Sequence, residues 1–205
     1  SVASYIGGDI ISGLIGTGVF QRTETVLYID IGTNGEIVVG NADWMISASC
    51  SAGPAFEGGG IRHGILATSG AIEGFRVDPS TDQPIITTIG GDRPRGICGA
   101  GLISIVAGLF LGGVIDQKGR FQSTQSDHVR TVSDGQEYLL ATAEETETGN
   151  DIVLTEVDMD NLVRAKAAMY AGYQTLLSSV DMSFDQLDKI VVAGTFGSHL
   201  NIEDA

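Results

Sequence analysis

The sequence predicts an α/β fold in which helices flank a mixed sheet, and three observations support this prediction. Strand-like apolar runs occupy residues 26–31 near the start of the chain and residues 190–193 near its end. Between them, apolar side chains recur every three or four positions over residues 159–180, which is typical of an amphipathic helix. Both apolar runs lead into glycine-containing turns, so we expect functional groups where these strands end.

Composition limits the classes of function that the chain can have. At 205 residues and 42% hydrophobic content, it can bury one substantial core with an insertion. Its formal net charge of −15 would repel nucleic-acid phosphates and anionic lipids, so we expect neither partner. The longest apolar stretch, residues 101–115, is shorter than the roughly 20 residues that a transmembrane helix needs.

Features of the N-terminus and of the cysteines predict a cytoplasmic protein. Residues 1–5 lack the basic and apolar regions of a secretory signal, and Cys50 and Cys98 do not form a disulfide-scaffold or paired-ligand spacing. Two cysteines are also too few for an iron–sulfur cluster, which takes about four thiolates. Both ends of the sequence look cut, and we therefore expect a fragment of a longer protein.

The first part of the chain predicts a helix and an antiparallel meander. Residues 10–20 are apolar and dotted with glycine, which indicates a short helix packed closely on a neighbour. Strands are expected at residues 26–31, 36–39 and 44–49.

After a glycine-rich segment, the pattern predicts two further strands, near residues 74–77 and 85–89, and a helix over residues 99–111. The polar residues 119–157 are interpreted as an insertion of hairpins with a solvated loop. Asp158 is the expected N-cap of the long helix, and residues 190–193 form the last strand.

The segment Asp30-Ile31-Gly32-Thr33-Asn34-Gly35-Glu36 carries the strongest functional signal. It follows a wholly apolar strand, and its glycines permit a turn whose backbone N–H groups can hold phosphate oxygens. Thr33 and Asn34 add side-chain donors, and Asp30 offers a carboxylate to Mg²⁺, directly or through water. The alternative is an ordinary Asn-Gly hairpin.

The segment Gly194-Thr195-Phe196-Gly197 carries the second signal, because it follows the last apolar strand. A glycine turn there would let the backbone lie flat against an adenine or ribose, and the alternative is a plain strand-terminating turn. We expect Asp30 and Gly194 to lie at adjacent strand ends that face one cleft.

Three other residues are candidates for function, and each also has a purely structural explanation. Asp9 could activate water or bind metal, or it could cap the following helix. Cys98, in a run of small residues, is expected to be buried and not nucleophilic. Lys166 interrupts the predicted apolar stripe of Met159, Val163, Tyr170 and Tyr173, and either reaches a ligand or extends its charged end to solvent.

Four motifs in this order resemble one family over essentially the whole chain, from Tyr5 onward. They are Asp30 to Glu36, Ala52-Gly53-Pro54-Ala55-Phe56-Glu57-Gly58, Gly96-Ile97-Cys98-Gly99-Ala100-Gly101, and Ala193 to Gly197. The chain resembles the C-terminal part of the reductive activators of corrinoid proteins, within the superfamily of acetate and sugar kinases, heat-shock chaperones and actin. The resemblance implies a ribonuclease-H-like lobe.

The resemblance also assigns roles. Residues 30–36 would be a phosphate loop with Mg²⁺ at Asp30, residues 193–197 the adenosine loop, and Glu57 would lie near the nucleotide. Thr195 and Ala100 depart from the family pattern, which has glycine and serine there. Residues 1–22 would belong with an upstream part, and residues 23–205 would form the ATP-binding lobe.

In the full-length activator that the resemblance implies, ATP hydrolysis would let an N-terminal ferredoxin-type domain, holding a [2Fe–2S] cluster, reduce the cobalt of a partner methyltransferase corrinoid protein. We expect this segment alone to fold and to be inactive as an ATPase, because the opposite phosphate loop is missing from it. The alternatives are a lobe of a small-molecule kinase and a non-catalytic interaction module with the same fold.

Overall fold

The computed structural model describes residues 6–32, 34–122 and 126–204. The chain divides into two compact units. Unit 1 comprises Ser1–Gly53 and Arg164–Ser198, and unit 2 comprises Pro54–Val163 and His199–Ala205. Within the described ranges, no helix has the length and apolarity that a membrane-spanning helix requires.

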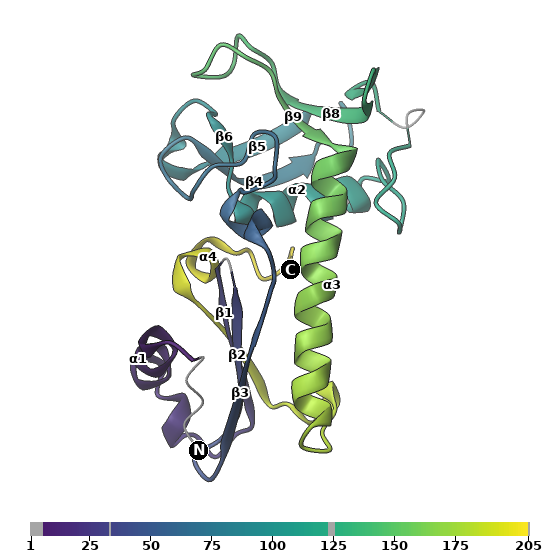
Figure 1. Cartoon of the computed structure of the whole chain (residues 1–205). Coiled ribbons are helices and arrows are strands. Elements are labelled where there is room, and N and C mark those ends of the chain that lie inside the picture. The colour runs from purple at the N-terminus through teal and green to yellow at the C-terminus, as the bar shows by residue number, and fades with distance from the viewer. Residues whose placement is uncertain (1–5, 33, 123–125, 205) are drawn as a thin grey trace. The chain divides into compact units, whose positions relative to one another are not determined.

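Unit 1 is built on a four-stranded mixed sheet with the order β10-β1-β2-β3 (Figure 1). The strands are β1 (Val26–Ile31), β2 (Gly35–Gly40), β3 (Met45–Cys50) and β10 (Lys189–Ala193). β1, β2 and β3 pair antiparallel, whereas β10 pairs parallel with β1. This confirms the prediction of a mixed sheet flanked by helices.

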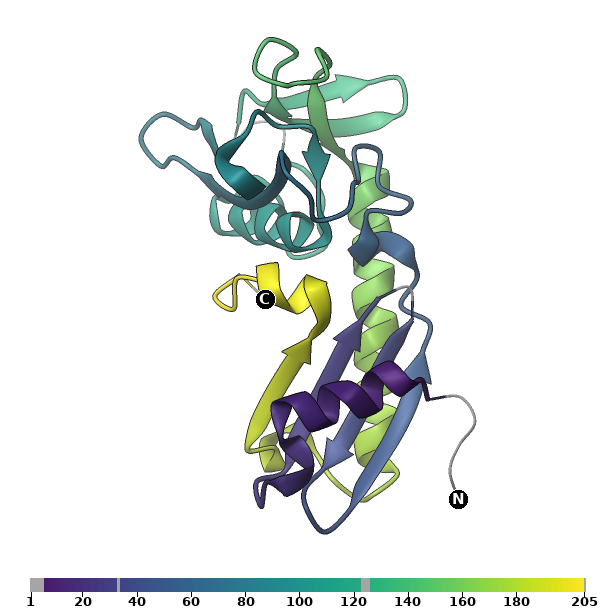
Figure 2. The same ribbon diagram turned by 90° about the vertical axis from the view of Figure 1, so that its left-hand side faces the viewer.

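One face of this sheet is covered by α1 (Gly8–Thr17), as Figure 2 shows, and the chain continues into the short helix η1 (Val19–Gln21). The helix and sheet share one apolar cluster: Ile10, Leu14, Val19, Val26, Tyr28 and Val38. A Cβ on Gly13 would lie 1.9 Å from the Tyr28 hydroxyl, so glycine permits this close approach. The assignment of residues 1–22 to an upstream part stays a prediction.

The opposite face of the sheet is covered by the part of α3 (Glu156–Ser178) that belongs to unit 1 (Figures 1 and 2). The helix approaches the sheet closely at Gly172, where a Cβ would lie 3.1 Å from Cys50 Sγ. Buried apolar positions along the whole helix are Met159, Leu162, Ala165, Met169, Leu176 and Leu177.

The predicted apolar stripe of α3 was partly wrong. Val163 and Tyr170 are 51% and 53% exposed, because the buried stripe passes through Leu162 and Met169 instead. The Tyr170 ring stacks on Phe184, at the start of η4 (Phe184–Gln186), with centroids 5.5 Å apart. Lys166 is therefore exposed and does not interrupt the core.

Unit 2 contains a three-stranded sheet with the order β5-β4-β6, packed against α2 (Gly99–Leu111). Its strands are β4 (Ala71–Val77), β5 (Pro84–Thr88) and β6 (Gly96–Ile97), and its short helices are η2 (Pro54–Glu57) and η3 (Ile89–Gly91). A Cβ on Gly101 would lie 1.9 Å from the Ile72 carbonyl oxygen, so α2 lies directly on β4.

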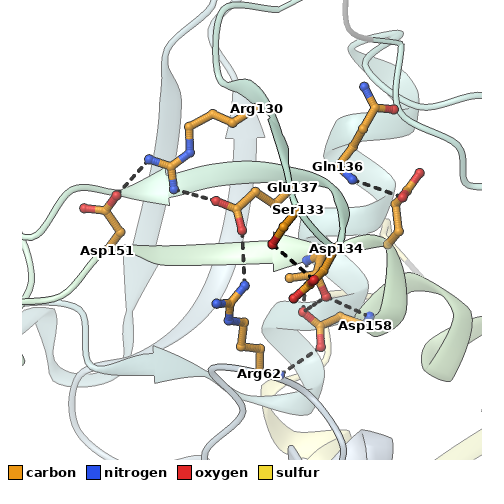
Figure 3. Close-up of polar contacts among 10 residues, drawn as sticks. Arg62, Arg130, Ser133, Asp134, Gln136, Glu137, Asp151 and Asp158 are labelled. Carbon is orange, nitrogen blue, oxygen red and sulfur yellow. Dashed lines mark hydrogen bonds and ion pairs between the residues drawn. The ribbon is translucent and has the colours of Figure 1, made fainter.

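The second sheet of unit 2 is antiparallel and consists of β7 (Val129–Val132), β8 (Gly135–Ala141) and β9 (Ile152–Thr155). It lies within the region expected to form polar hairpins. Figure 3 shows the ion pairs of this sheet, in which Glu137 is the central carboxylate. It accepts hydrogen bonds from Arg130 at 2.8 Å and from Arg62 at 3.2 Å, and Arg130 also donates to Asp151 at 2.8 Å.

The start of α3 differs from the prediction in one detail. Asp158 was expected to be the N-cap, but the helix begins at Glu156 and Asp158 lies in its first turn. The Asp158 N–H donates to Thr155 Oγ1, and the Asp158 carboxylate accepts from the Thr155 N–H and hydroxyl. This exchange is that of a capping box, with Thr155 as the cap.

Candidate functional site

The two sequence motifs meet at the ends of β1 and β10. The parallel register pairs Asp30 with Ala193, so Gly194 follows immediately beside the Asp30 carboxylate. Gly194 has a φ of +81°, and a Cβ there would lie 2.8 Å from Asp30 Oδ1. The prediction that Asp30 and Gly194 lie at adjacent strand ends is confirmed, and the cleft that they were expected to face stays a prediction.

Three carboxylates influence one another at this end of the sheet. Asp30 pairs with Glu36 across β1 and β2, so both side chains lie on one face. Burial, followed by the charge of Asp9 in the first turn of α1, raises the pKa of Asp30. Burial, Asp9 and Asp30 likewise raise the pKa of Glu36, although the Ser49 hydroxyl lowers it slightly. We call these three neighbouring acids, Asp9, Asp30 and Glu36, the Asp30 cluster.

The Asp30 cluster is not a protein-only metal cage. Among the residues that the structure describes, no group of three or more His, Cys, Asp or Glu side chains could hold a metal ion. Mg²⁺ commonly keeps several waters and binds through one or two carboxylates together with substrate phosphates. Asp30 lies beside Gly194, which has no side chain, and near the carboxylates of Asp9 and Glu36, so it fits that water-mediated mode.

The hairpin between β1 and β2 holds the remaining residues of the first motif. Thr33 lies outside the described residues. The Gly32 N–H donates to the Asn34 carbonyl at 3.0 Å, so in this structure the turn uses that N–H internally. Asn34 is exposed.

Gly35 makes close contacts that the sequence did not indicate. It lies in β2 without a left-handed φ, and a Cβ there would lie 2.2 Å from Met169 Sδ. Cys50 lies directly opposite in β3 and donates to the Gly35 carbonyl at 3.2 Å. Gly35 therefore lets α3 and Cys50 pack beneath the hairpin.

The second motif is a helix and not the expected glycine turn. α4 (Gly194–His199) starts directly after β10. Thr195 is exposed, whereas Phe196 is only 9% exposed, so its ring faces the protein. A Cβ on Gly197 would lie 2.9 Å from the Val192 carbonyl oxygen, so this glycine serves the packing of α4 on β10.

The remaining candidates lie in unit 2. Glu57 ends η2, and its proximity to a nucleotide stays a prediction. Cys98 is 1% exposed, its thiol donates to the Ile72 carbonyl at 3.2 Å, and burial raises its pKa, so the expectation that it is buried is confirmed. Ala100 is 4% exposed. A Cβ on Gly99 would lie 1.8 Å from the Phe56 carbonyl oxygen, so the small residues here serve tight packing.

Sequence reasoning missed two features beside the site. Gly13 and Tyr28 set the height of α1 above the sheet, and α1 carries Asp9. Cys50 lies 3.3 Å from Met169 Sδ and supports the hairpin from below. The pairing of Cys50 with Gly35 follows from counting back along the antiparallel β2 and β3 strands from their turn, so the sequence contained that signal.

Comparison with known proteins gives a consistent result. A family model described as the C-terminal domain of RACo, the ASKHA domain, matches residues 24–205. The corrinoid activation enzyme RamQ of Eubacterium limosum is 34% identical over 212 residues, covering 100% of this chain and 35% of RamQ. The [Co(II) methylated amine-specific corrinoid protein] reductase of Methanosarcina barkeri is 28% identical over 227 residues, covering 100% of this chain and 38% of the reductase.

A solved structure extends this result to three dimensions. A reductive activator for corrinoid, iron-sulfur protein superposes with a TM-score of 0.93 and 48% sequence identity, covering 100% of this chain and 33% of the activator chain. The present chain therefore spans about a third of the length of the relatives that it matches.

Proposed function

Since the chain belongs to the family of C-terminal ASKHA domains of RACo, we propose that it is the nucleotide-binding lobe of a reductive activator of corrinoid proteins. Both named relatives act in corrinoid activation or reduction by their names, and the structural neighbour is a reductive activator. In corrinoid activation, the role of this chain would be to bind Mg²⁺-ATP.

The observation that carries the proposal is the pairing of β1 with β10, which brings Asp30 against Gly194. The carboxylate would hold Mg²⁺ through water, because it lies beside another acid, Asp9, whose charge raises its pKa after burial does. Gly32, Thr33, Asn34, Gly35 and Glu36 would border the phosphates, with Asn34 as an exposed donor.

Gly194 and the exposed Thr195 would lie along the ribose and adenine. Phe196 and Gly197 would support that segment from inside, since the ring is buried and the glycine packs on Val192. Asp9, on the same side of the sheet, is a candidate for orienting a water molecule. In this proposal, the chain orients the nucleotide through these groups.

In the whole protein, an upstream lobe would complete the nucleotide site. An iron–sulfur domain would supply the electron that reduces the cobalt of the partner corrinoid protein. The proposed setting is the cytoplasm. Binding and hydrolysis of ATP would change the conformation of the protein so that the electron can pass to the cobalt.

The test is isothermal titration calorimetry of Mg²⁺-ATP binding to the full-length protein and its Asp30→Ala variant. We expect about a tenfold or larger rise in Kd, since loss of groups that orient a bound ion typically costs that much. Folding stability should change little, because removing one member of a like-charged cluster relieves repulsion.

Asp43→Ala is the matched control, because Asp43 is an exposed acid of the same unit outside the Asp30 cluster. It should leave the Kd unchanged. Unchanged ATP affinity in Asp30→Ala, with a large fall in Tm, would show that Asp30 is structural and would overturn the proposal. Rapid ATP-dependent phosphorylation of a small molecule without a corrinoid protein would identify a kinase instead.

A further inference from the structure

The short helix α4, which carries the second motif, makes contacts at both of its ends with residues far away in the sequence. Just before its start, Ala193 pairs with Asp30 in the parallel register of β10 and β1. At its end, the imidazole Nδ1 of His199 lies 2.9 Å from Glu73 Oε2 in β4, although the two residues are 126 positions apart. The proposed nucleotide function uses the start of this helix and gives no role to its end.

The contact between His199 and Glu73 is a hydrogen bond in which the imidazole donates. An ionised carboxylate can only accept, so Nδ1 must carry the proton, whichever charge the ring has. Each of the two side chains is 28% exposed. Breaking the bond would therefore leave a partly desolvated donor and a partly desolvated acceptor, which is unfavourable.

The residues directly after α4 are bonded to β4 and α2 as well. The hydroxyl of Ser104, which is 2% exposed in α2, donates to Asp204 Oδ2 at 2.6 Å. The same hydroxyl accepts the Phe75 N–H of β4 at 2.9 Å. The side-chain amide of Asn201 also donates to Asp204, at 3.1 Å. These contacts tie residues 199–204 to β4 and α2, which belong to the same unit.

The direction of α4 depends on such contacts, because the helix has little stability of its own. It has six residues, whereas isolated helices shorter than about 12–15 residues are marginal in water. Its first residue, Gly194, has a φ of +81° and no side chain that restricts rotation at the junction with β10. The packing of Gly197 on β10 and the bond of His199 therefore set the direction of the helix together.

A rotation of α4 at its end would be felt at its start. At a rise of about 1.5 Å per residue, the helix extends only about 7.5 Å from Gly194 to His199. The space beside Asp30 is narrow, since a Cβ on Gly194 would lie 2.8 Å from Asp30 Oδ1. A small rotation would therefore change how the exposed residues Gly194 and Thr195 lie relative to Asp30.

We propose that His199 and Glu73 are positioning residues that set the start of α4 for the ribose and adenine of the nucleotide. The inference rests on the proposed function, because it concerns the adenosine side of that site. Glu73 holds His199, and His199 holds the end of α4. The helix in turn presents Gly194 and Thr195 to the adenosine. The pair acts on the binding of the adenosine and not on that of the phosphates at Asp30.

The test compares two ligands of the full-length protein by isothermal titration calorimetry. They are Mg²⁺-ATP and Mg²⁺-tripolyphosphate, which has the phosphates and lacks the adenosine. His199→Ala should raise the Kd of Mg²⁺-ATP about fivefold, the effect of losing one hydrogen bond of ordinary strength. It should leave the Kd of Mg²⁺-tripolyphosphate unchanged, whereas a general loss of folding would weaken both ligands alike.

Three further variants locate the effect. His199→Asn places a side-chain N–H donor close to the position of Nδ1 and should restore most of the affinity for ATP. The double variant of His199→Ala and Glu73→Ala should bind ATP no more weakly than either single variant, because both remove the same bond. His128→Ala is the matched control and should leave both Kd values unchanged. His128 is a half-buried histidine of unit 2 whose ring lies beside Tyr138, with centroids 5.7 Å apart.

Hydrogen exchange followed by mass spectrometry gives a second measurement that does not depend on ligand affinity. In His199→Ala, the amides of residues 194–198 should exchange about fivefold faster, because the helix has lost the bond at its end. The amides of β1 should exchange at the unaltered rate, since the sheet does not depend on this bond.

The inference is overturned if His199→Ala leaves the Kd of Mg²⁺-ATP unchanged, or if it weakens both ligands equally. Exchange of residues 194–198 at the rate of the unmodified protein would also overturn it. Asp30→Ala separates the inference from the proposed function. If Asp30→Ala weakens both ligands and His199→Ala weakens neither, only the inference fails. If Asp30→Ala weakens neither ligand, the proposed function fails, and the inference fails with it.

Discussion

The carboxylates of Glu137 in unit 2 and Asp30 in unit 1 differ in the charges that surround them. Glu137 is 5% exposed and accepts from two arginines, Arg62 and Arg130. Asp30 is half-buried beside two further acids, Asp9 and Glu36. A buried charge that the chain balances itself serves the fold, whereas one left among like charges is available to a cation from outside.

The pKa shifts of acids in the two regions differ in the same way as their surrounding charges. The hydrogen bond from Arg130 is the main cause that lowers the pKa of Asp151, a member of the Glu137 network. Burial and Asp9 raise the pKa of Asp30. The two regions should therefore respond in opposite directions to substitution and to pH.

The largest expected effect is that of Glu137→Ala, which would leave two arginines without their shared carboxylate. We expect a loss of about 2 kcal/mol in the free energy of unfolding, below the value for a fully buried pair because both arginines are partly exposed. Urea unfolding measures it, with Glu144→Ala as an exposed control. A loss equal to that of the control would mean that the network contributes nothing.

The next effect concerns the height of α1 above the sheet. Gly13→Ala should destabilise by about 1.5 kcal/mol, because the added Cβ meets the buried Tyr28 hydroxyl. Gly16→Ala in the same helix has nothing within 4 Å and should instead stabilise by a few tenths of a kcal/mol. Equal Tm changes in the two variants would contradict the packing described for Gly13.

A smaller effect tests the contact between the two motifs. Gly194→Ala should destabilise by about 1 kcal/mol through its left-handed φ and its approach to Asp30. Gly18→Ala is the control, since Gly18 has a φ of +68° and no atom within 4 Å. Combining Gly194→Ala with Asp30→Ala should recover the part of the loss that is due to the contact, as a double-mutant cycle measures.

The smallest effect is a pH dependence in metal-free buffer. Asp30 has a folded pKa above its ordinary value of 3.8, so the folded state binds its proton more tightly. The contribution of Asp30 to the free energy of unfolding is thus fully present below pH 3.8 and is lost as pH rises through the pKa of the folded state.

Asp151 acts in the opposite direction, because its pKa is lowered and its contribution is lost as pH falls below 3.8. Asp9→Asn should reduce the loss of folding stability that Asp30 causes as pH rises. It should leave unchanged the loss that Asp151 causes as pH falls. Thermal melts from pH 3 to 7 would show this, and identical pH profiles for Asp9→Asn and the unmodified chain would contradict the coupling of Asp9 to Asp30.

Much of the fold followed from local pattern. The strand over residues 26–31 matches β1 residue for residue, and the helix over 99–111 matches α2, because long apolar runs bounded by glycine leave few alternatives. The stripe of α3 was misplaced by counting Val163 and Tyr170 as core. Both are apolar enough to be buried, and only the approach at Gly172 decides which face meets the sheet.

Less of the site was predictable. The order of the motifs brought Asp30 and Gly194 together correctly, since parallel neighbours end at one edge. The helical form of residues 194–199 was missed, because a short glycine-containing segment has little helix propensity and the packing of Gly197 on Val192 overrides it. The rise in the pKa of Asp30 comes first from burial and then from the charge of Asp9, more than twenty residues away in sequence, and local pattern contains neither.

Because Cys50 packs under the hairpin, the reactivity of its thiol can report on the hairpin in the unmodified chain. The other cysteine, Cys98, is buried and 1% exposed, so a thiol-alkylating reagent would react first at the half-buried Cys50. Burial raises the pKa of Cys50 and makes that reaction slow. Any ligand that tightens the loop above Gly35 would slow it further, and one that loosens the loop would accelerate it. The labelling rate therefore gives a kinetic reading of hairpin motion without an engineered probe.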